Sequence, residues 1–158
     1  MKMREIVADQ AIVSKLEAAT RDGAIDELLG ALIAAEVVDG ALRDELRTAI
    51  LDREAKGSTG FGRGVAIPHV KHDAVGKISA AIGVSEAGID FSSLDGQPVH
   101  CVFLLVSPAG DPEVHLHAME VIFTNLSKDA FRRFLRQAST ADDVIAVLDD
   151  ADNQRLPS

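Results

Sequence analysis

The segment "VHCVFLLVS", residues 99–107, is nearly all apolar. A strand with one face in water alternates apolar and polar side chains, whereas a strand buried on both faces does not. This segment therefore predicts a central strand with other layers packed on both of its faces. Cys101, the only cysteine, lies within it, so we expect a buried, unreactive thiol and no internal disulfide.

Two shorter segments upstream have a similar texture. "GVAIPH" at residues 64–69 and "ISAAIGVS" at residues 78–85 are rich in Val, Ile and Ala, and they are bounded by Gly, Pro, Ser and Asp. Asp95-Gly96, followed by Pro98, predicts a turn before the central strand. A further short strand near "AIVSKL", residues 11–16, has only a weak signal.

Helical periodicity comes before and after these strands. Apolar residues at helical spacing predict helices at residues 22–38 and 39–57, with Asp39 as a cap and Gly57 as a stop, and a short turn joins them into a hairpin. Three more helices are predicted at about 112–128, 129–138 and 140–151, with Asp129 and Thr140 as candidate N-caps. This order predicts an α/β (α+β) fold, a three-layer α/β/α sandwich with a mixed, mostly central sheet flanked by helices.

Length and composition bound the function. At 158 residues, with 47% apolar and 26% charged residues, the chain predicts a single domain at residues 1–152 and a C-terminal tail at 153–158. A net charge of −9 argues against nucleic acid, because neutralising phosphates takes a basic surface. The chain has no apolar run long enough for a membrane span and no signal-peptide core at its start, so we expect a cytoplasmic protein without membrane insertion.

The glycine-rich stretch "GSTGFGRG", residues 57–64, does not carry a nucleotide-binding pattern. It lacks the phosphate-binding loop consensus and follows a predicted helix, whereas a dinucleotide fingerprint follows a strand. Two interpretations stay open. The stretch is either a flexible surface turn or a loop whose backbone N–H groups approach an anion, which glycine permits.

The five histidines do not predict a metal site, and no cofactor is expected. His115 and His117 lie on a predicted helix, where residues two apart point in nearly opposite directions. His69 is different because of its surroundings: Pro68 stiffens the backbone before it, and Arg53 stands at a helix end upstream.

Further groups near His69 favour phosphate chemistry. Ser58 and Thr59 supply hydroxyls, and His115 belongs to the first turn of a helix, whose dipole favours anions. Imidazole is a nucleophile that is near neutral at pH 7, and guanidinium binds phosphate oxygens with two parallel hydrogen bonds. These groups can hold a phosphoryl group on a histidine, and no arrangement typical of a hydrolase is evident.

The segment "REAKGSTGFGRGVAIPH", residues 53–69, resembles the signature of the fructose/mannitol/nitrogen-type enzyme IIA domain of the bacterial phosphoenolpyruvate-dependent phosphotransferase system. A second motif of that family, a His-Leu pair opening the helix after the last core strand, is similar to His115-Leu116. The similarity runs from about residue 5 to residue 150. Phe61 stands where the family usually has an aliphatic residue, and Arg63 where it often has an acidic or polar one.

The resemblance implies a function and a site. His69 would accept the phosphoryl group, His115 would be the second active-site histidine, Arg53 would clamp the phosphate, and Ser58 and Thr59 would line the site. The implied partner is a histidine phosphocarrier protein (HPr/NPr-like), with a downstream IIB domain or regulated protein targets after it. A nitrogen-type regulator is favoured over a sugar-transport subunit. The alternative is a non-catalytic interaction or anion-sensing module with the same fold. His72 and His117 are expected outside the site, on the solvated surface.

Overall fold

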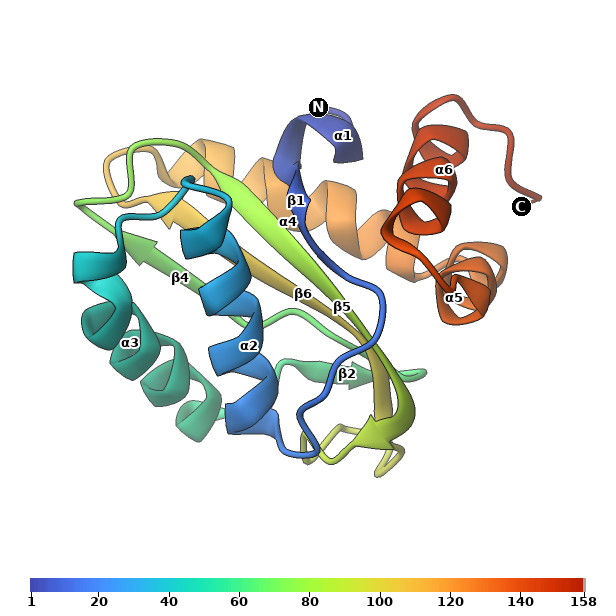
Figure 1. Cartoon of the computed structure of the whole chain (residues 1–158), viewed down its shortest axis with the longest axis horizontal. Coiled ribbons are helices and arrows are strands. Elements are labelled where there is room, and N and C mark those ends of the chain that lie inside the picture. The colour runs from blue at the N-terminus through green and yellow to red at the C-terminus, as the bar shows by residue number, and fades with distance from the viewer. Residues whose placement is uncertain (158) are drawn as a thin grey trace.

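A computed structural model describes residues 1–157 of the chain (Figure 1). Within these residues six strands form one mixed sheet in the order β1-β5-β6-β3-β2, with β4 also paired to β6. The strands are β1 (Val7–Val13), β2 (Gly60–Gly62), β3 (Val65–Ala66), β4 (His69–His72), β5 (Ser79–Ile89) and β6 (Val99–Pro108). The helices are α1 (Met3–Ile6), α2 (Arg21–Ala34), the 3-10 turn η1 (Gly40–Leu42), α3 (Arg43–Lys56), α4 (Pro112–Leu126), α5 (Asp129–Gln137) and α6 (Ala141–Asp152).

Strand β6 is the central strand that its apolar sequence predicts. It pairs with β5 in antiparallel orientation and with both β3 and β4 in parallel orientation. Val102, Leu104 and Val106 point into one apolar cluster, while Cys101 and Phe103 point into the other. Every one of these side chains is fully buried, so the prediction of a strand covered on both faces is confirmed. Burial also raises the pKa of the Cys101 thiol to about 12, which keeps it protonated and unreactive.

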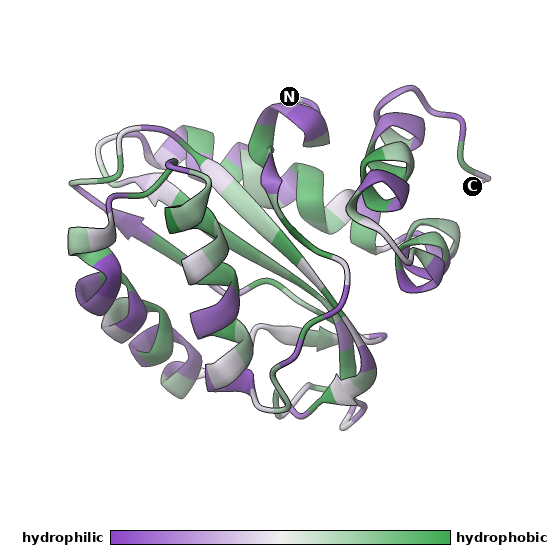
Figure 2. Ribbon diagram, viewed as in Figure 1, coloured by the Kyte–Doolittle hydropathy of each residue, from purple (hydrophilic) through white to green (hydrophobic). Residues whose placement is uncertain are grey.

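Helices cover both faces of the sheet, which confirms the three-layer fold. The cluster on one face joins β6 to α2 and α3, and the cluster on the other joins it to α1, α4, α5 and α6. Figure 1 shows α2 and α3 on the near side of the sheet and α4 behind it. Figure 2 shows that the middle of the long strands β5 and β6 is mostly apolar, whereas α3 presents polar residues outward. Each helix of residues 1–157 is too short or too polar to span a membrane.

Several local features differ from the sequence predictions. Strand β1 is seven residues long and parallel to β5, although its sequence signal is weak. Helix α1 was not predicted, because four residues carry too little periodicity; its Met3 is buried and its backbone N–H donates to Asp152 on α6. Thr140 caps α6 as predicted, but Asp129 is not a cap. It is the first residue of α5, and its carboxylate pairs with Arg133.

Candidate functional site

His69 opens β4, where the chain enters the sheet beside β6. The Leu105 N–H donates to the Pro68 carbonyl at 3.0 Å, which fixes the backbone just before the imidazole. The His69 ring folds back, so that Nδ1 lies 2.8 Å from the Ile67 carbonyl oxygen. Because a carbonyl can only accept, Nδ1 carries the proton. The other ring nitrogen, Nε2, is therefore left with a free lone pair.

His115 reaches the same place from helix α4. It lies in the first turn of α4, which Asp111 caps by accepting from the Val114 N–H. The His115 ring is buried, and its centroid is 5.5 Å from that of His69, with the two planes tilted by 52°. The two histidines that the sequence singles out are thus neighbours in the fold.

Ser107 orients the His115 ring, although no motif in the sequence indicates this role. This serine of β6 is fully buried, and its Oγ lies 2.7 Å from His115 Nδ1. A hydroxyl can donate or accept, and within residues 1–157 His115 Nδ1 is the one hydrogen-bond partner of the Ser107 hydroxyl. The buried Ser107 proton therefore has an acceptor only in the tautomer in which it is donated to Nδ1. The proton of the neutral His115 ring is then on Nε2, where it is free to be donated.

Both imidazoles are held neutral near pH 7. Burial lowers the pKa of His69, and the nearby Arg53 charge lowers it further, although the hydrogen bond to Ile67 acts in the opposite direction. Burial also lowers the pKa of His115, to about 4, with smaller effects from the charges of His69 and Lys71. A neutral ring keeps the lone pair that a nucleophile needs.

Arg53 and Glu54 lie in the last turn of α3, and both bind the loop that follows this helix. The Arg53 guanidinium donates to the Gly57 carbonyl at 2.7 Å. Glu54 is buried, and its carboxylate accepts from both the N–H and the hydroxyl of Thr59. The Glu54 charge acts to raise the pKa of His69. Glu54 was not among the predicted site residues, although it belongs to the Arg-Glu pair of the motif.

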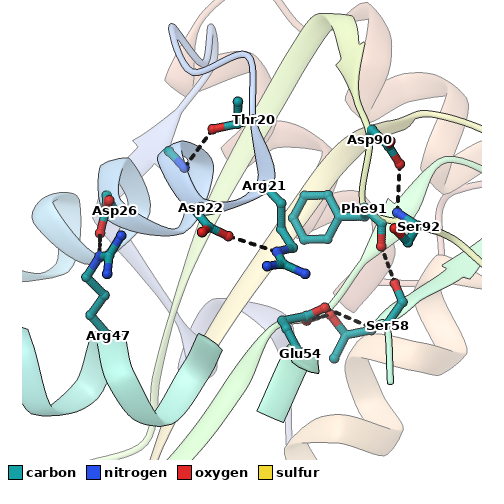
Figure 3. Close-up of polar contacts among 12 residues, drawn as sticks. Thr20, Arg21, Asp22, Asp26, Arg47, Glu54, Ser58, Asp90, Phe91 and Ser92 are labelled. Atoms are coloured by element: carbon teal, nitrogen blue, oxygen red, sulfur yellow. Dashed lines mark hydrogen bonds and ion pairs between the residues drawn. The ribbon is translucent and has the colours of Figure 1, made fainter. Parts of the chain in front are cut away.

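The hydroxyls of the glycine-rich loop bind protein groups in this structure. Ser58 Oγ donates to the Phe91 carbonyl at 2.5 Å and accepts from the Gly60 N–H, as Figure 3 shows for the first contact. The Thr59 hydroxyl is directed to Glu54, and its carbonyl accepts from the Ile67 N–H at 3.3 Å. The loop thus supports the strand that leads to the His69 imidazole.

Close packing explains one glycine of this loop. A Cβ at Gly60 would lie 2.5 Å from the Ser93 hydroxyl oxygen and 3.2 Å from the Phe91 side chain. Any larger residue would push the loop away from the β5–β6 connection. This packing contradicts the interpretation of the stretch as a flexible surface turn, and the approach of its backbone N–H groups to an anion stays a prediction.

The remaining histidines lie apart from this pair. His72, at the far end of β4, contacts Glu45 through Nε2 at 2.9 Å. His117 is exposed on α4, and His100 Nδ1 lies 2.9 Å from the Ser85 carbonyl. The structure therefore brings together His69 and His115, with the Arg53 charge acting on His69, and leaves the other three histidines outside.

The family model of the phosphoenolpyruvate-dependent sugar phosphotransferase system, EIIA 2, matches residues 5–151. The chain belongs to this family. Two members match this chain over most of their own length. The nitrogen regulatory protein of Bradyrhizobium diazoefficiens is 36% identical over 148 residues, which are 94% of this chain and 95% of that protein. The fructose-specific EIIA component of Haloferax volcanii is 38% identical over 131 residues, 81% of this chain and 84% of that protein.

A larger relative carries an EIIA 2 domain as one part. The fructose-specific EIIABC component of Bacillus subtilis is 35% identical over 152 residues, which are 96% of this chain but 24% of that protein. The present chain spans about a quarter of that relative. Members named for nitrogen regulation and for fructose are thus both similar to it.

Solved EIIA 2 structures share the fold. Nitrogen regulatory protein IIA-Ntr from Neisseria meningitidis superposes with a TM-score of 0.82 at 28% identity, covering 91% of this chain and 97% of that one. Enzyme IIA mannitol of Escherichia coli, solved in complex with phosphorylated enzyme IIB mannitol, gives a TM-score of 0.75 at 21% identity, covering 90% of this chain and 95% of that one.

Proposed function

We propose that the chain is a phosphoryl-relay protein, and that His69 accepts the group from a histidine phosphocarrier protein. The observation that carries the proposal is the pairing of a neutral His69, whose Nε2 lone pair is free, with the buried ring of His115 at 5.5 Å. Membership of the EIIA 2 family supports this reading.

In the proposed step, His69 Nε2 attacks the phosphorus of the phosphohistidine on the carrier. The N–P bond on the carrier breaks, its imidazole leaves with the electron pair, and a new N–P bond forms on His69. The hydrogen bond from Nδ1–H to the Ile67 carbonyl supports the positive charge that develops on the ring. His115 Nε2–H would donate to a phosphoryl oxygen, and Arg53 would neutralise the added charge. Ser58 and Thr59 would line the site, mainly by holding the loop in shape. Such transfer depends chiefly on positioning and charge neutralisation.

For the physiological role, we propose a nitrogen-type regulator rather than a sugar-transport subunit. Two similarities support this choice. The alignment with the Bradyrhizobium nitrogen regulatory protein covers 94% of this chain and 95% of that protein, and the Neisseria IIA-Ntr structure superposes with a TM-score of 0.82. The test is transfer from the phosphorylated chain to a purified fructose-type IIB domain. A regulator is expected to transfer slowly or not at all, and efficient transfer to the IIB domain would assign the chain to transport.

The first test of phosphoryl acceptance is labelling. The purified chain, incubated with phosphoenolpyruvate and the general phosphotransferase enzymes, is expected to gain one phosphoryl mass. His69→Ala should abolish this gain, because the nucleophile is removed. His72→Ala removes an imidazole three residues along the same strand and is the matched control, so it should label like the wild type. Labelling that survives in His69→Ala would reject the assignment.

The chemistry of the linkage and the role of His115 can be tested together. A phosphoryl group on imidazole is expected to be lost in acid and kept in alkali, whereas a serine or threonine phosphate behaves in the opposite way. His115→Ala should still accept the group but transfer it poorly, because it loses a hydrogen-bond donor and not the nucleophile. A label found on His115 in the wild type would reverse the two roles.

A further inference from the structure

A second cluster of cationic side chains lies outside the histidine site. A cavity of about 600 Å³ is lined by Arg63, Asp129, Arg132, Arg133, Arg136 and Gln137. Arg63 comes from the turn between β2 and β3, and the other residues belong to α5, beside that turn in Figure 1. Four guanidinium groups thus face a single carboxylate, in a chain whose net charge is −9.

Contacts within the protein use only part of these donors. Arg132 donates to the Leu126 carbonyl at 2.8 Å and lies 3.5 Å from the Asp129 carboxylate, so it helps to end α4. Arg133 pairs with the same carboxylate at 3.0 Å. Arg63 reaches the Ser127 carbonyl only at 3.5 Å. Each guanidinium has five N–H donors, so the exposed side chains of Arg133 and Arg136 keep donors for a ligand in the cavity.

Arg136 is the side chain that internal structure explains least. It is exposed, and within residues 1–157 its guanidinium makes no hydrogen bond or ion pair. Asp129 is the carboxylate that lines the cavity, and it already pairs with Arg132 and Arg133. A cluster of positive charge around one cavity favours the binding of an anion there.

The chemistry of the cavity selects phosphate oxygens as the ligand atoms. Guanidinium groups bind phosphate through paired, charge-assisted hydrogen bonds. The volume falls within the roughly 300–1,000 Å³ typical of small-molecule sites, which is more space than one phosphate group fills. Several linked phosphates would place one or more anionic groups against each arginine.

The cavity is distinct from the phosphoryl-transfer site. His115 lies in the first turn of α4, and Arg132 and Arg63 meet the chain at Leu126 and Ser127, where α4 ends. At 1.5 Å per residue, these two ends of the helix are about 16 Å apart. An anion in the cavity therefore does not occupy the place of the group on His69.

We propose that this arginine-lined cavity binds an oligophosphate anion, a chain of two or more phosphates that is either free or carried by a nucleotide. The proposal goes beyond phosphoryl relay and does not depend on it.

Isothermal titration calorimetry of the full chain at fixed salt tests this site, with inorganic tripolyphosphate, a nucleoside triphosphate and orthophosphate as probes. Tripolyphosphate is expected to bind with one-to-one stoichiometry and more tightly than orthophosphate. Arg136→Gln and Arg63→Gln should each weaken binding about tenfold or more, because each removes charge-assisted hydrogen bonds. Arg132 is not substituted in this test, because it also donates to the Leu126 carbonyl at the end of α4. If the nucleoside triphosphate binds no more tightly than tripolyphosphate, the phosphate chain alone is recognised; tighter binding shows that the nucleoside contributes.

Two control variants separate this site from general attraction and from the histidine site. Arg155→Gln removes an arginine whose side chain is 67% exposed and which lies outside the cavity, so its affinity should equal that of the wild type. Arg53→Gln alters the proposed phosphoryl site and should also bind tripolyphosphate normally. Absent binding at millimolar tripolyphosphate, an equal loss in Arg155→Gln, or full affinity in an Arg136→Gln, Arg63→Gln double variant would each overturn the proposal.

Discussion

At the residue scale, the site depends on which nitrogen of each imidazole carries the proton. The Ile67 carbonyl fixes the proton of His69 on Nδ1, and the Ser107 hydroxyl leaves that of His115 on Nε2. In the proposed step, one ring attacks and the other donates. Burial lowers both pKa values, so both rings are neutral near pH 7.

Arg53 gives the first prediction at this scale. Phosphohistidine brings close to two negative charges into a partly buried site, and losing one charge-assisted pair typically costs about 2–5 kcal/mol. Arg53→Gln should therefore slow labelling by roughly two to three powers of ten, at about 1.4 kcal/mol for each. Arg53→Lys should rescue only part of the rate, because an ammonium lacks the planar fork. Labelling rates from the phosphocarrier are the measurement.

The control for Arg53 is Lys56→Gln, which removes one exposed positive charge from the same helix end. It should label at the wild-type rate, and thermal melting should show that both variants are folded. Unchanged labelling in a folded Arg53→Gln protein would leave Arg53 with only its structural contact to Gly57.

Ser107→Ala tests how His115 is oriented. The substitution leaves a buried imidazole nitrogen without its partner, which should cost about 1–3 kcal/mol of folding free energy. It should also let the His115 proton redistribute between the two ring nitrogens, which ¹⁵N NMR of the ring reports, and slow onward transfer. Ser79→Ala removes another buried serine hydroxyl, which pairs in register with Val106 and so lies on the opposite face of the sheet from His115; it should change neither the His115 nitrogen shifts nor onward transfer. Unchanged His115 nitrogen shifts in Ser107→Ala would contradict the assignment.

At the element scale, helix ends place the functional groups. Arg53 and Glu54 sit in the last turn of α3, and His115 sits in the first turn of α4. The loop after α3 is tied to Glu54 at one side and to Ile67 at the other. Helix α6 lies away from the site and supports the fold through its packing on α1 and α5.

Helix α6 provides a stability prediction at this scale. The Thr140 hydroxyl accepts from the Asp143 N–H, and the Asp143 carboxylate accepts from the Thr140 N–H, which is a reciprocal capping box. Thr140→Ala should destabilise the protein by about 1 kcal/mol, or roughly 2–4 °C in Tm for a chain of this size. Labelling of His69 should be unaffected. Thr124→Ala, at an exposed position within α4, is the control; an equal or larger loss of Tm there would show that the cap contributes little.

At the scale of the whole molecule, one sheet with two apolar faces brings distant segments together. Strand β6 contacts β4, which carries His69, and it holds Ser107 at its own end, under His115. The two buried clusters fix these positions from opposite sides. The packing that removes water from the sheet therefore also buries the two imidazoles of the proposed site.

The depressed histidine pKa values predict how global stability depends on pH. Because the folded pKa of His115, about 4, is below its unfolded value of about 6.5, the unfolded chain binds more protons between these two values. The free energy of unfolding should therefore fall as the pH falls from about 6.5 towards 4. The lowered pKa of His69 acts in the same direction. Urea unfolding of the wild type and His115→Asn at several pH values measures this contribution, and the variant should show the shallower dependence.

His117→Asn is the control for that series, because it changes an exposed histidine of the same helix. Its pH dependence should match that of the wild type. Equal slopes in His115→Asn and the wild type would show that the His115 ring is protonated alike in the folded and unfolded chains.

Local sequence patterns determined the elements and the family. The apolar run of β6, the helical periodicities, the Gly57 stop and the Thr140 cap are short-range features, and the structure contains all of them. The motif from Arg53 to His69 also identified the family, because its residues are consecutive in the sequence. The prediction of Asp129 as a cap is wrong. Lys128 occupies the N-cap position of α5, and the Asp129 carboxylate pairs with Arg133 in the following turn.

Only the tertiary structure decided which distant groups meet. The local sequence does not distinguish Ser107 from other strand serines. Only the fold places its Oγ 2.7 Å from His115 Nδ1. The partners of the Ser58 and Thr59 hydroxyls, and the cavity that joins Arg63 to α5, likewise depend on packing between segments far apart in the chain. Such contacts depend on how helices cover the two apolar faces of the sheet. The whole chain determines this packing, not the residues next to each group in the sequence.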